Sequence, residues 1–179
     1  MNRAKTIALA VATVFVLAST TASAKDMGGK FGVGYEQNLT GSAGGLNVQY
    51  WFGNLSLGML LGLDYFKPDS GDSTMTFNLA PHVLYAVARS NEANLNMGIR
   101  LPIGIMDPGA GDTQFGLQIE LPIVGEYFFS DHFAIFGQVG LVFELPVGDQ
   151  NVLSGRAKGF GVGIGGAAFS GGAGFNFYF

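Results

Sequence analysis

Apolar and polar side chains alternate along much of this chain. In the stretch TQFGLQIELPIVGEYFF, residues 113–129, the odd-numbered positions are mostly apolar or aromatic: Phe115, Leu117, Ile119, Leu121, Ile123 and Tyr127. The even-numbered positions include the polar residues Gln114, Gln118, Glu120 and Glu126. A two-residue period over this length predicts a β-strand with one apolar and one polar face.

The same alternation recurs in eight segments: 31–39, 46–52, 55–66, 75–87, 95–105, 113–127, 133–147 and a last strand within 160–179. The breaks between them, such as KPDSGDST, RSNEA and MDPGAGD, are rich in the Gly, Pro, Asp, Asn and Ser that favour turns. Strands joined by such short links are antiparallel neighbours. The pattern therefore predicts an all-β fold with eight antiparallel strands in up-and-down order.

The first 24 residues do not follow this pattern. Arg3 and Lys5 precede an apolar run over 7–18, and the segment ends in Ala22-Ser23-Ala24. A basic start, a short apolar core and a small-x-small end are typical of a secretory signal peptide. We expect residues 1–24 to be cleaved, which leaves 25–179 as a single domain. The absence of Cys excludes disulfides, thiolate metal sites and a lipid anchor on Cys.

Charge narrows the choice of partners. The formal net charge is −4, and removal of Arg3 and Lys5 with the signal peptide changes it to −6. An acidic chain of this kind disfavours nucleic acid as a partner, because the negatively charged nucleic acid binds preferentially to basic patches. Mean hydropathy is nevertheless high, at +0.33, although no apolar run of about 18 residues follows the signal peptide.

The residue types on the polar faces indicate where the apolar faces point. In a soluble sandwich or lipocalin-like barrel the polar face meets water and normally carries many Lys and Glu. Here the polar faces are mostly Gly, Asn, Gln and Ser, whereas Lys67 and Lys158 fall in links and Lys30 at a strand entrance. Small residues suit the narrow interior of an eight-stranded barrel. We therefore predict an eight-stranded antiparallel up-and-down transmembrane β-barrel, with its apolar face on lipid.

Aromatic residues gather near the strand ends, as in the two aromatic girdles of outer-membrane barrels. One end has Trp51, Phe52, Tyr127, Phe128, Phe129, Phe133 and Phe179, and the other has Tyr65, Phe66, Phe77, Phe115 and Phe143.

The C-terminal sequence GGAGFNFYF resembles the terminal strand of bacterial outer-membrane barrels, with a final Phe preceded by aromatic residues at alternate positions. The chain is thus similar to the small eight-stranded OmpA/OmpX-type superfamily, without a periplasmic OmpA-like domain. The resemblance implies that barrel assembly machinery reads Phe175, Phe177 and Phe179. It also implies contact with outer-membrane lipid and lipopolysaccharide, and possible contact with other envelope proteins.

An even strand number puts both termini in the periplasm. The breaks near 53, 89–93 and 128–132 are then periplasmic turns, and those near 40–44, 67–74, 106–112 and 147–158 face outward.

Charged residues at inward positions are the candidate interior site: Glu36, Asp64, His82, Arg100, Glu120, Glu126 and Glu144. A hairpin centred near residue 109 pairs Arg100 with a position near 118 and leaves Glu120 one diagonal step away. A buried guanidinium needs a partner. We predict that Arg100 anchors an ion-pair network with Glu120 and Glu144.

No catalytic, cofactor or metal site is expected. Lipid A deacylases resemble this chain in size, but neither His82 nor His132 is placed with a Ser as a nucleophile–base pair would require. The similar sequences RLPIG, ELPIV and ELPVG are interpreted as bulges or strand ends at Pro102, Pro122 and Pro146.

The expected function is a non-enzymatic structural or anchoring protein of the cell outer membrane. The alternative is a narrow channel for small solutes, followed by a lipid A-modifying enzyme.

Overall fold

The computed structural model describes residues 25–179 apart from 39–44, 148–149, 155, 158 and 164–169. The expected signal peptide over 1–24 and the predicted turn at 40–44 lie outside the described residues. The same holds for parts of the link at 147–158 and of the last predicted strand within 160–179.

The described residues form an all-β fold. The strands are β1 (Phe31–Asn38), β2 (Gly45–Phe52), β3 (Leu55–Phe66), β4 (Thr74–Arg89), β5 (Ala93–Arg100), β6 (Ile103–Asp107), β7 (Gln114–Phe128), β8 (Phe133–Leu145), β9 (Gln150–Asn151), β10 (Arg156–Ala157), β11 (Gly161–Gly163) and β12 (Ser170–Tyr178). No described segment forms a helix with the length and apolarity that a bilayer crossing needs.

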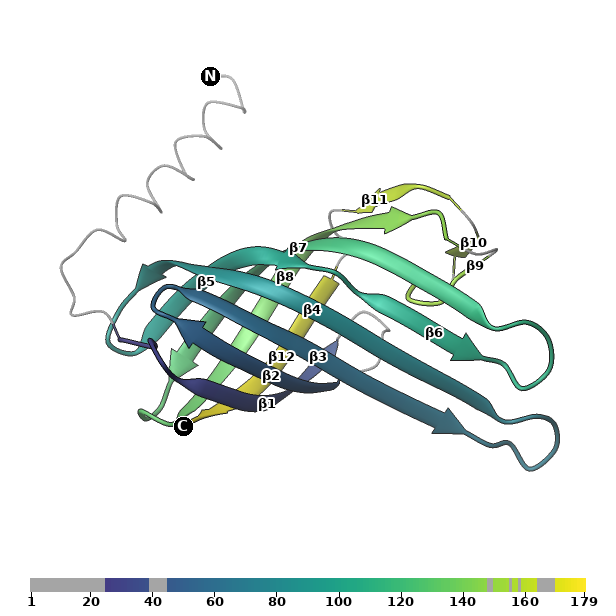
Figure 1. The fold of residues 1–179 in the computed structure, drawn as a ribbon, viewed down its shortest axis with the longest axis horizontal. Coiled ribbons are helices and arrows are strands. Elements are labelled where there is room, and N and C mark those ends of the chain that lie inside the picture. Colours follow the sequence, from purple (N-terminus) through teal and green to yellow (C-terminus); the bar gives the residue numbers. More distant parts are fainter. Residues whose placement is uncertain (1–24, 39–44, 148–149, 155, 158, 164–169) are drawn as a thin grey trace, which may run out of the picture.

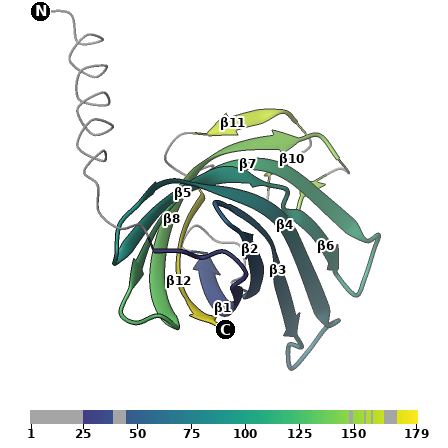
Figure 2. The same ribbon diagram turned by 60° about the vertical axis from the view of Figure 1, so that its left-hand side comes forward.

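The long strands close into a ring of eight antiparallel positions (Figures 1 and 2). Each strand from β1 to β4 pairs with the next, β5 and β6 together fill the fifth position, and β7 and β8 follow. β12 pairs with both β8 and β1, which joins the two ends of the sheet. β5 and β6 are one predicted strand interrupted at Leu101 and Pro102, where Pro102 supplies no backbone N–H.

The register of the strands shows how strongly the ring is sheared. From Tyr35, the paired residues lead through β2, β3, β4, β6 and β7 to Leu145 on β8. In the other direction, Tyr35 pairs with Phe175 and Phe175 with Ile135, also on β8. The two paths meet β8 at positions 145 and 135, ten residues apart. Eight strands with such an offset are tilted by about 40° and leave an interior just wide enough for side chains.

The inward face of the ring is largely polar and the outward face is largely apolar, which is the reverse of the usual arrangement in a soluble protein. The buried, inward positions include many polar side chains: Glu36, Asn47, Gln49, Ser56, Asn78, His82, Asn94, Asn96, Arg100, Glu120, Glu126, Gln138, Glu144 and Asn176. The exposed positions that alternate with them are mostly apolar, such as Leu57, Ile99, Ile123 and Val139.

The aromatic girdle expected at one end is wrong for Trp51 and Phe128. Both were counted in the aromatic girdle at one end of the barrel, but both are buried inside that end of the ring, with exposed fractions of 0% and 4%. Their neighbours Phe52 and Phe129 point outward and are 57% and 62% exposed. The alternation along β2 and β7 continues to the last residue of each strand, and it places these two aromatic rings in the interior.

At the opposite end, the β3–β4 and β6–β7 hairpins extend beyond the shorter strands β1 and β2 (Figure 1). Asp64 lies on the extended part of β3. It shares the inward face of β3 with Ser56 and Leu60, but unlike them it is exposed. Asp64 was expected in the enclosed interior, and that expectation is wrong because the strands that would cover it end earlier.

Candidate functional site

The interior of the ring is centred on Arg100, the last residue of β5. Its guanidinium meets the Glu36 carboxylate of β1 side by side, with Nη1 donating to Oε1 at 2.8 Å and Nη2 donating to Oε2 at 3.0 Å. Arg100 is 5% exposed and Glu36 is 1% exposed. A bidentate, charge-assisted pair of this kind is the geometry that a guanidinium and a carboxylate favour. Because the pair is buried, loss of either partner would leave an unpaired charge away from water.

Gln138 of β8 completes this central group. Nη2 of Arg100 donates to Gln138 Oε1 at 3.0 Å, and Gln138 Nε2 donates to Glu36 Oε1 at 2.6 Å. Three side chains from β1, β5 and β8 therefore form a closed triangle across the ring. Sequence reasoning missed Gln138 and did not pair Arg100 with Glu36. Nothing local signals these contacts, because the partners are 38 and 64 residues from Arg100.

Glu120 of β7 is the second carboxylate at Arg100. It lies directly opposite Arg100 in the ladder between β5 and β7, which corrects the expected pairing of Arg100 with a position near 118. The distance from Arg100 Nη1 to Glu120 Oε2 is 3.7 Å, longer than the contact with Glu36. The expected Arg100–Glu120 contact is therefore present, but Glu36 is the closer partner.

A second polar group surrounds Glu126 of β7. Tyr178 donates its hydroxyl hydrogen to Glu126 Oε1, and Asn176 Nδ2 lies 3.4 Å from the same oxygen. Gln49 Nε2 in turn donates to the Tyr178 hydroxyl at 2.6 Å, and Asn47 Nδ2 donates to Asn176 Oδ1 at 3.0 Å. Tyr178 and Asn176 of β12 thus donate to the carboxylate directly, and Gln49 and Asn47 of β2 donate to these two residues.

The other predicted interior residues are also buried. His82 of β4 is opposite Arg100 in the ladder and is 4% exposed. Glu144 of β8 is 4% exposed and lies opposite Gln118 and Gly161. Of the seven residues expected inside, only Asp64 lies in the open.

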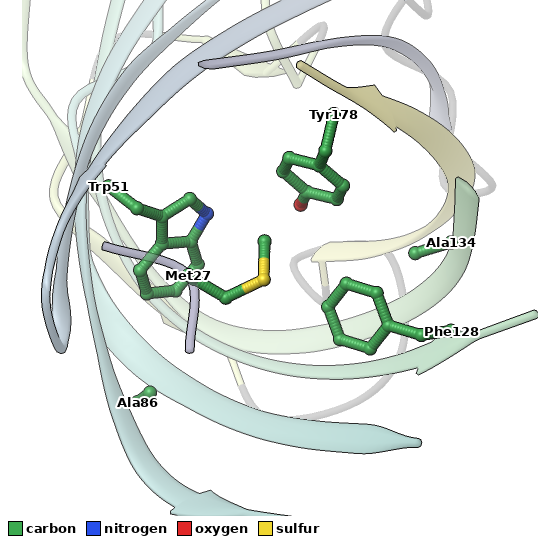
Figure 3. Packing of buried hydrophobic residues seen from close by; sticks show 6 residues of the cluster. All are labelled: Met27, Trp51, Ala86, Phe128, Ala134 and Tyr178. Carbon is green, nitrogen blue, oxygen red and sulfur yellow. The ribbon is translucent and has the colours of Figure 1, made fainter. Parts of the chain in front are cut away.

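One end of the interior is closed by an apolar plug. Met27, Trp51, Ala86, Phe128, Ala134 and Tyr178 pack together there, and Figure 3 shows the Met27 side chain between the Trp51 and Phe128 rings. Met27, Trp51 and Tyr178 have no exposed surface. The plug was not expected from the sequence, because Met27 precedes the first strand and stands outside any alternating pattern.

The segment from Lys25 to Lys30 holds this plug in place by contacting all three turns at this end of the ring. Gly29 N donates to Trp51 O at 2.8 Å next to the β2–β3 turn, and Lys25 N donates to Ser90 O at 3.1 Å in the β4–β5 turn. Lys25 Nζ donates to Ser130 O at 2.8 Å and lies 3.2 Å from the Asp131 carboxylate in the β7–β8 turn.

The remaining free space in the interior is small and divided. One cavity of about 10 Å³, lined by Glu126, His82 and Asn96 among others, lies on the plug side of Arg100. A second of about 40 Å³ is lined by Glu120, Asn78 and Gln118 and is bordered by Leu153. Leu153 and Val152 also pack over Gly104 of β6, where an added Cβ would lie within 3 Å of both side chains. A cavity of about 10–15 Å³ has room for one water molecule, so these spaces have room for a few water-sized particles and for no larger solute.

The expected assembly signal lies on the outer surface. Phe175, Phe177 and Phe179 are 39%, 46% and 74% exposed, and the rings of Phe175 and Phe177 contact each other at 5.9 Å and in turn contact Phe133 on β8.

Both histidines lie in the described part of the chain, and the two ring nitrogens of His82 are buried without a hydrogen-bond partner. His132 Nδ1 is 2.8 Å from the backbone oxygen of Tyr178, which accounts for its position in the β7–β8 turn. In the same part of the chain, no group of three or more His, Cys, Asp or Glu side chains is placed to hold a metal ion.

Neither a protein-family model nor a curated protein nor a solved structure matches this chain.

Arg100→Met is expected to lower the free energy of unfolding by roughly 3–5 kcal/mol, because it leaves Glu36 and Glu120 buried beside each other without a cation. Arg100→Met combined with Glu36→Met should cost clearly less than Arg100→Met alone, since it removes one of these carboxylates. Denaturant unfolding of both variants checks this, with Lys67→Met in the exposed β3–β4 link as a control near the parent. An unchanged midpoint for Arg100→Met would contradict the central role of this ion pair.

Met27→Ala is expected to open the plugged end. Trp51 is the single Trp of the chain, so its fluorescence reports on the plug directly. The rate of acrylamide quenching of Trp51 should rise in Met27→Ala and stay at the parent value in Met59→Ala, which truncates an outward methionine of β3. Equal quenching in the two variants would show that Met27 does not seal the ring.

Proposed function

We propose that the ring is a transmembrane β-barrel of the bacterial outer membrane, and that the protein is a non-enzymatic structural or anchoring component of the cell envelope. The observation that carries this proposal is the inverted polarity of the ring. Polar and charged side chains fill its interior, whereas its exposed surface is apolar on all eight strand positions. Soluble monomers rarely expose continuous apolar surface beyond a few hundred Å².

The outward faces support lipid contact in detail. In the central parts of the long strands β3, β4, β7 and β8, no Asp, Glu, Lys or Arg occupies an outward position. These four strands contain 12, 16, 15 and 13 residues. A tilted strand needs about 9–11 residues to cross the hydrocarbon core, so these strands are long enough.

Aromatic contacts support a membrane interface at the plugged end. Tyr50 and Phe52 on β2 contact each other with ring centroids 4.6 Å apart. Phe129 and Phe133 stack at 5.9 Å across the β7–β8 turn. Exposed aromatic rings at one level of the outer surface are typical of the girdles that flank the apolar band of outer-membrane barrels. The inward Trp51 and Phe128 are not part of this belt.

The proposed orientation places the plugged end in the periplasm. Lys25, Phe179 and the three short turns meet at this end, as an up-and-down barrel with periplasmic termini requires. The extended β3–β4 and β6–β7 hairpins then face outward, toward lipopolysaccharide. The exposed Phe175, Phe177 and Phe179 remain the proposed contact for the barrel assembly machinery. Other envelope proteins are the remaining proposed partners.

The divided interior favours a structural role over conduction. The Arg100–Glu36–Gln138 triangle crosses the ring between the two cavities, the plug closes one end, and Leu153 borders the outer cavity. Ions or solutes would have to break a buried ion pair and displace an apolar plug. We therefore propose a closed barrel that acts through its outer surface.

Lipid contact can be tested with tryptophan placed on either face of the ring. In a Trp51→Phe background, Val139→Trp should be strongly quenched by vesicle lipids with brominated acyl chains, because Val139 points outward and is 45% exposed. Val124→Trp, at an inward position of β7, should be quenched weakly. Equal quenching at both positions would contradict the proposal, as would a purified protein that stays monodisperse in plain buffer without detergent.

The closed interior predicts no conductance. The purified protein in planar bilayers should give no reproducible single-channel steps, because the cavities have room for only a few water-sized particles. Regular steps of one size from the parent protein would favour the alternative of a narrow channel. A porin reconstituted by the same procedure serves as the positive control.

A further inference from the structure

The small cavity beside Glu126 has an unusual lining. Three oxygen atoms of its lining residues accept no hydrogen bond from any described residue: Glu126 Oε2, Asn47 Oδ1 and Asn96 Oδ1. Each of these residues is less than 5% exposed. An unpaired polar atom in a buried site is unfavourable, and an unpaired charge is more so. Three such acceptors around one space therefore point to an occupant that satisfies them together.

Several donors near the cavity are used elsewhere, whereas Arg100 Nε and the two ring nitrogens of His82, on residues that also line it, have no partner. Tyr178 and Asn176 direct their hydrogens to Glu126 Oε1, the other oxygen of the same carboxylate. Asn47 uses its Nδ2 for Asn176. The oxygens that remain all require a positive or hydrogen-donating partner.

Charge in this part of the ring is also unbalanced. Arg100 lies on the cavity wall, but its Nη1 and Nη2 groups are held by Glu36, Glu120 and Gln138. Lys25 lies at the far side of the plug, bound to Ser130 and Asp131. Arg100 and Glu36 neutralise each other, so Glu126 adds one negative charge to an enclosed space.

We propose that this cavity binds one monovalent cation, coordinated by Glu126 Oε2, Asn47 Oδ1 and Asn96 Oδ1. Its size of about 10 Å³ admits a single water-sized sphere. Calcium takes six to eight oxygen ligands and magnesium retains several waters, so neither fits a site with one carboxylate and this little room. A proton on Glu126 would satisfy only one of the three oxygens. A cation bound by all three would satisfy them together and balance the negative charge of Glu126.

This site depends on the closed ring and its polar interior and does not require the ring to lie in a membrane. Failure of the cation test would therefore leave the proposed membrane location untouched, and the reverse also holds.

The experiment compares refolding of the full protein in sodium, potassium or choline chloride at equal ionic strength. Choline is too large for the cavity, so at least one small cation should raise the thermal midpoint relative to choline, by on the order of 5 °C. The shift should saturate with increasing concentration of the small cation. Equal midpoints in all three salts would overturn the proposal and indicate water or a protonated Glu126.

Matched variants place the effect in this cavity. Glu126→Gln should abolish the difference between the salts, and Asn96→Leu, which removes one oxygen at similar volume, should reduce it. Glu144→Gln alters another buried glutamate that does not line this cavity and should keep the full difference. A difference that persists in Asn96→Leu and Glu126→Gln would place the cation elsewhere and overturn the assignment. If Glu126→Gln does not refold, the test is whether the difference in thermal midpoint between the salts is smaller in Asn96→Leu than in Glu144→Gln.

Discussion

Pairing of β12 with both β1 and β8 joins the two ends of the sheet, and the rest of the structure depends on this closure. A closed ring has no strand edge with unpaired backbone groups, so its whole outer surface can be apolar. Closure with an offset of ten residues also fixes the width of the interior. Polar side chains that point inward cannot reach bulk water there and must satisfy one another.

The interior meets that requirement by grouping its charges. Arg100 is shared by Glu36, Gln138 and Glu120, which come from β1, β8 and β7. A buried ion pair is strongly destabilising when one partner is lost, even where the complete pair adds little net stability. The network therefore ties four strands, β1, β5, β7 and β8, to one arrangement. Glu126 has a different kind of environment, because its hydrogen-bond partners are neutral hydroxyl and amide groups rather than a guanidinium.

The sequence predicted the strands well because alternation is a local property. The predicted segment 55–66 coincides with β3 (Leu55–Phe66), and the predicted 113–127 differs from β7 (Gln114–Phe128) by one residue at each end. Contacts across the interior could not be predicted in the same way. Which carboxylate reaches Arg100 depends on the offset of the ring, and this offset appears only when all pairings are known. Met27 belongs to no strand, so no period indicates that it fills the end of the ring.

The many glycines of the chain have a related explanation in the interior. A Cβ on Gly58 would lie 2.3 Å from His82 Nε2, and one on Gly32 would lie 2.7 Å from the Tyr178 ring. Gly174 stands in the same relation to Phe136, at 2.6 Å. Each of these three inward side chains thus occupies space that a neighbouring strand leaves open by carrying glycine. In a ring this narrow, inward glycines decide where the large polar groups can lie, and through them which charges meet.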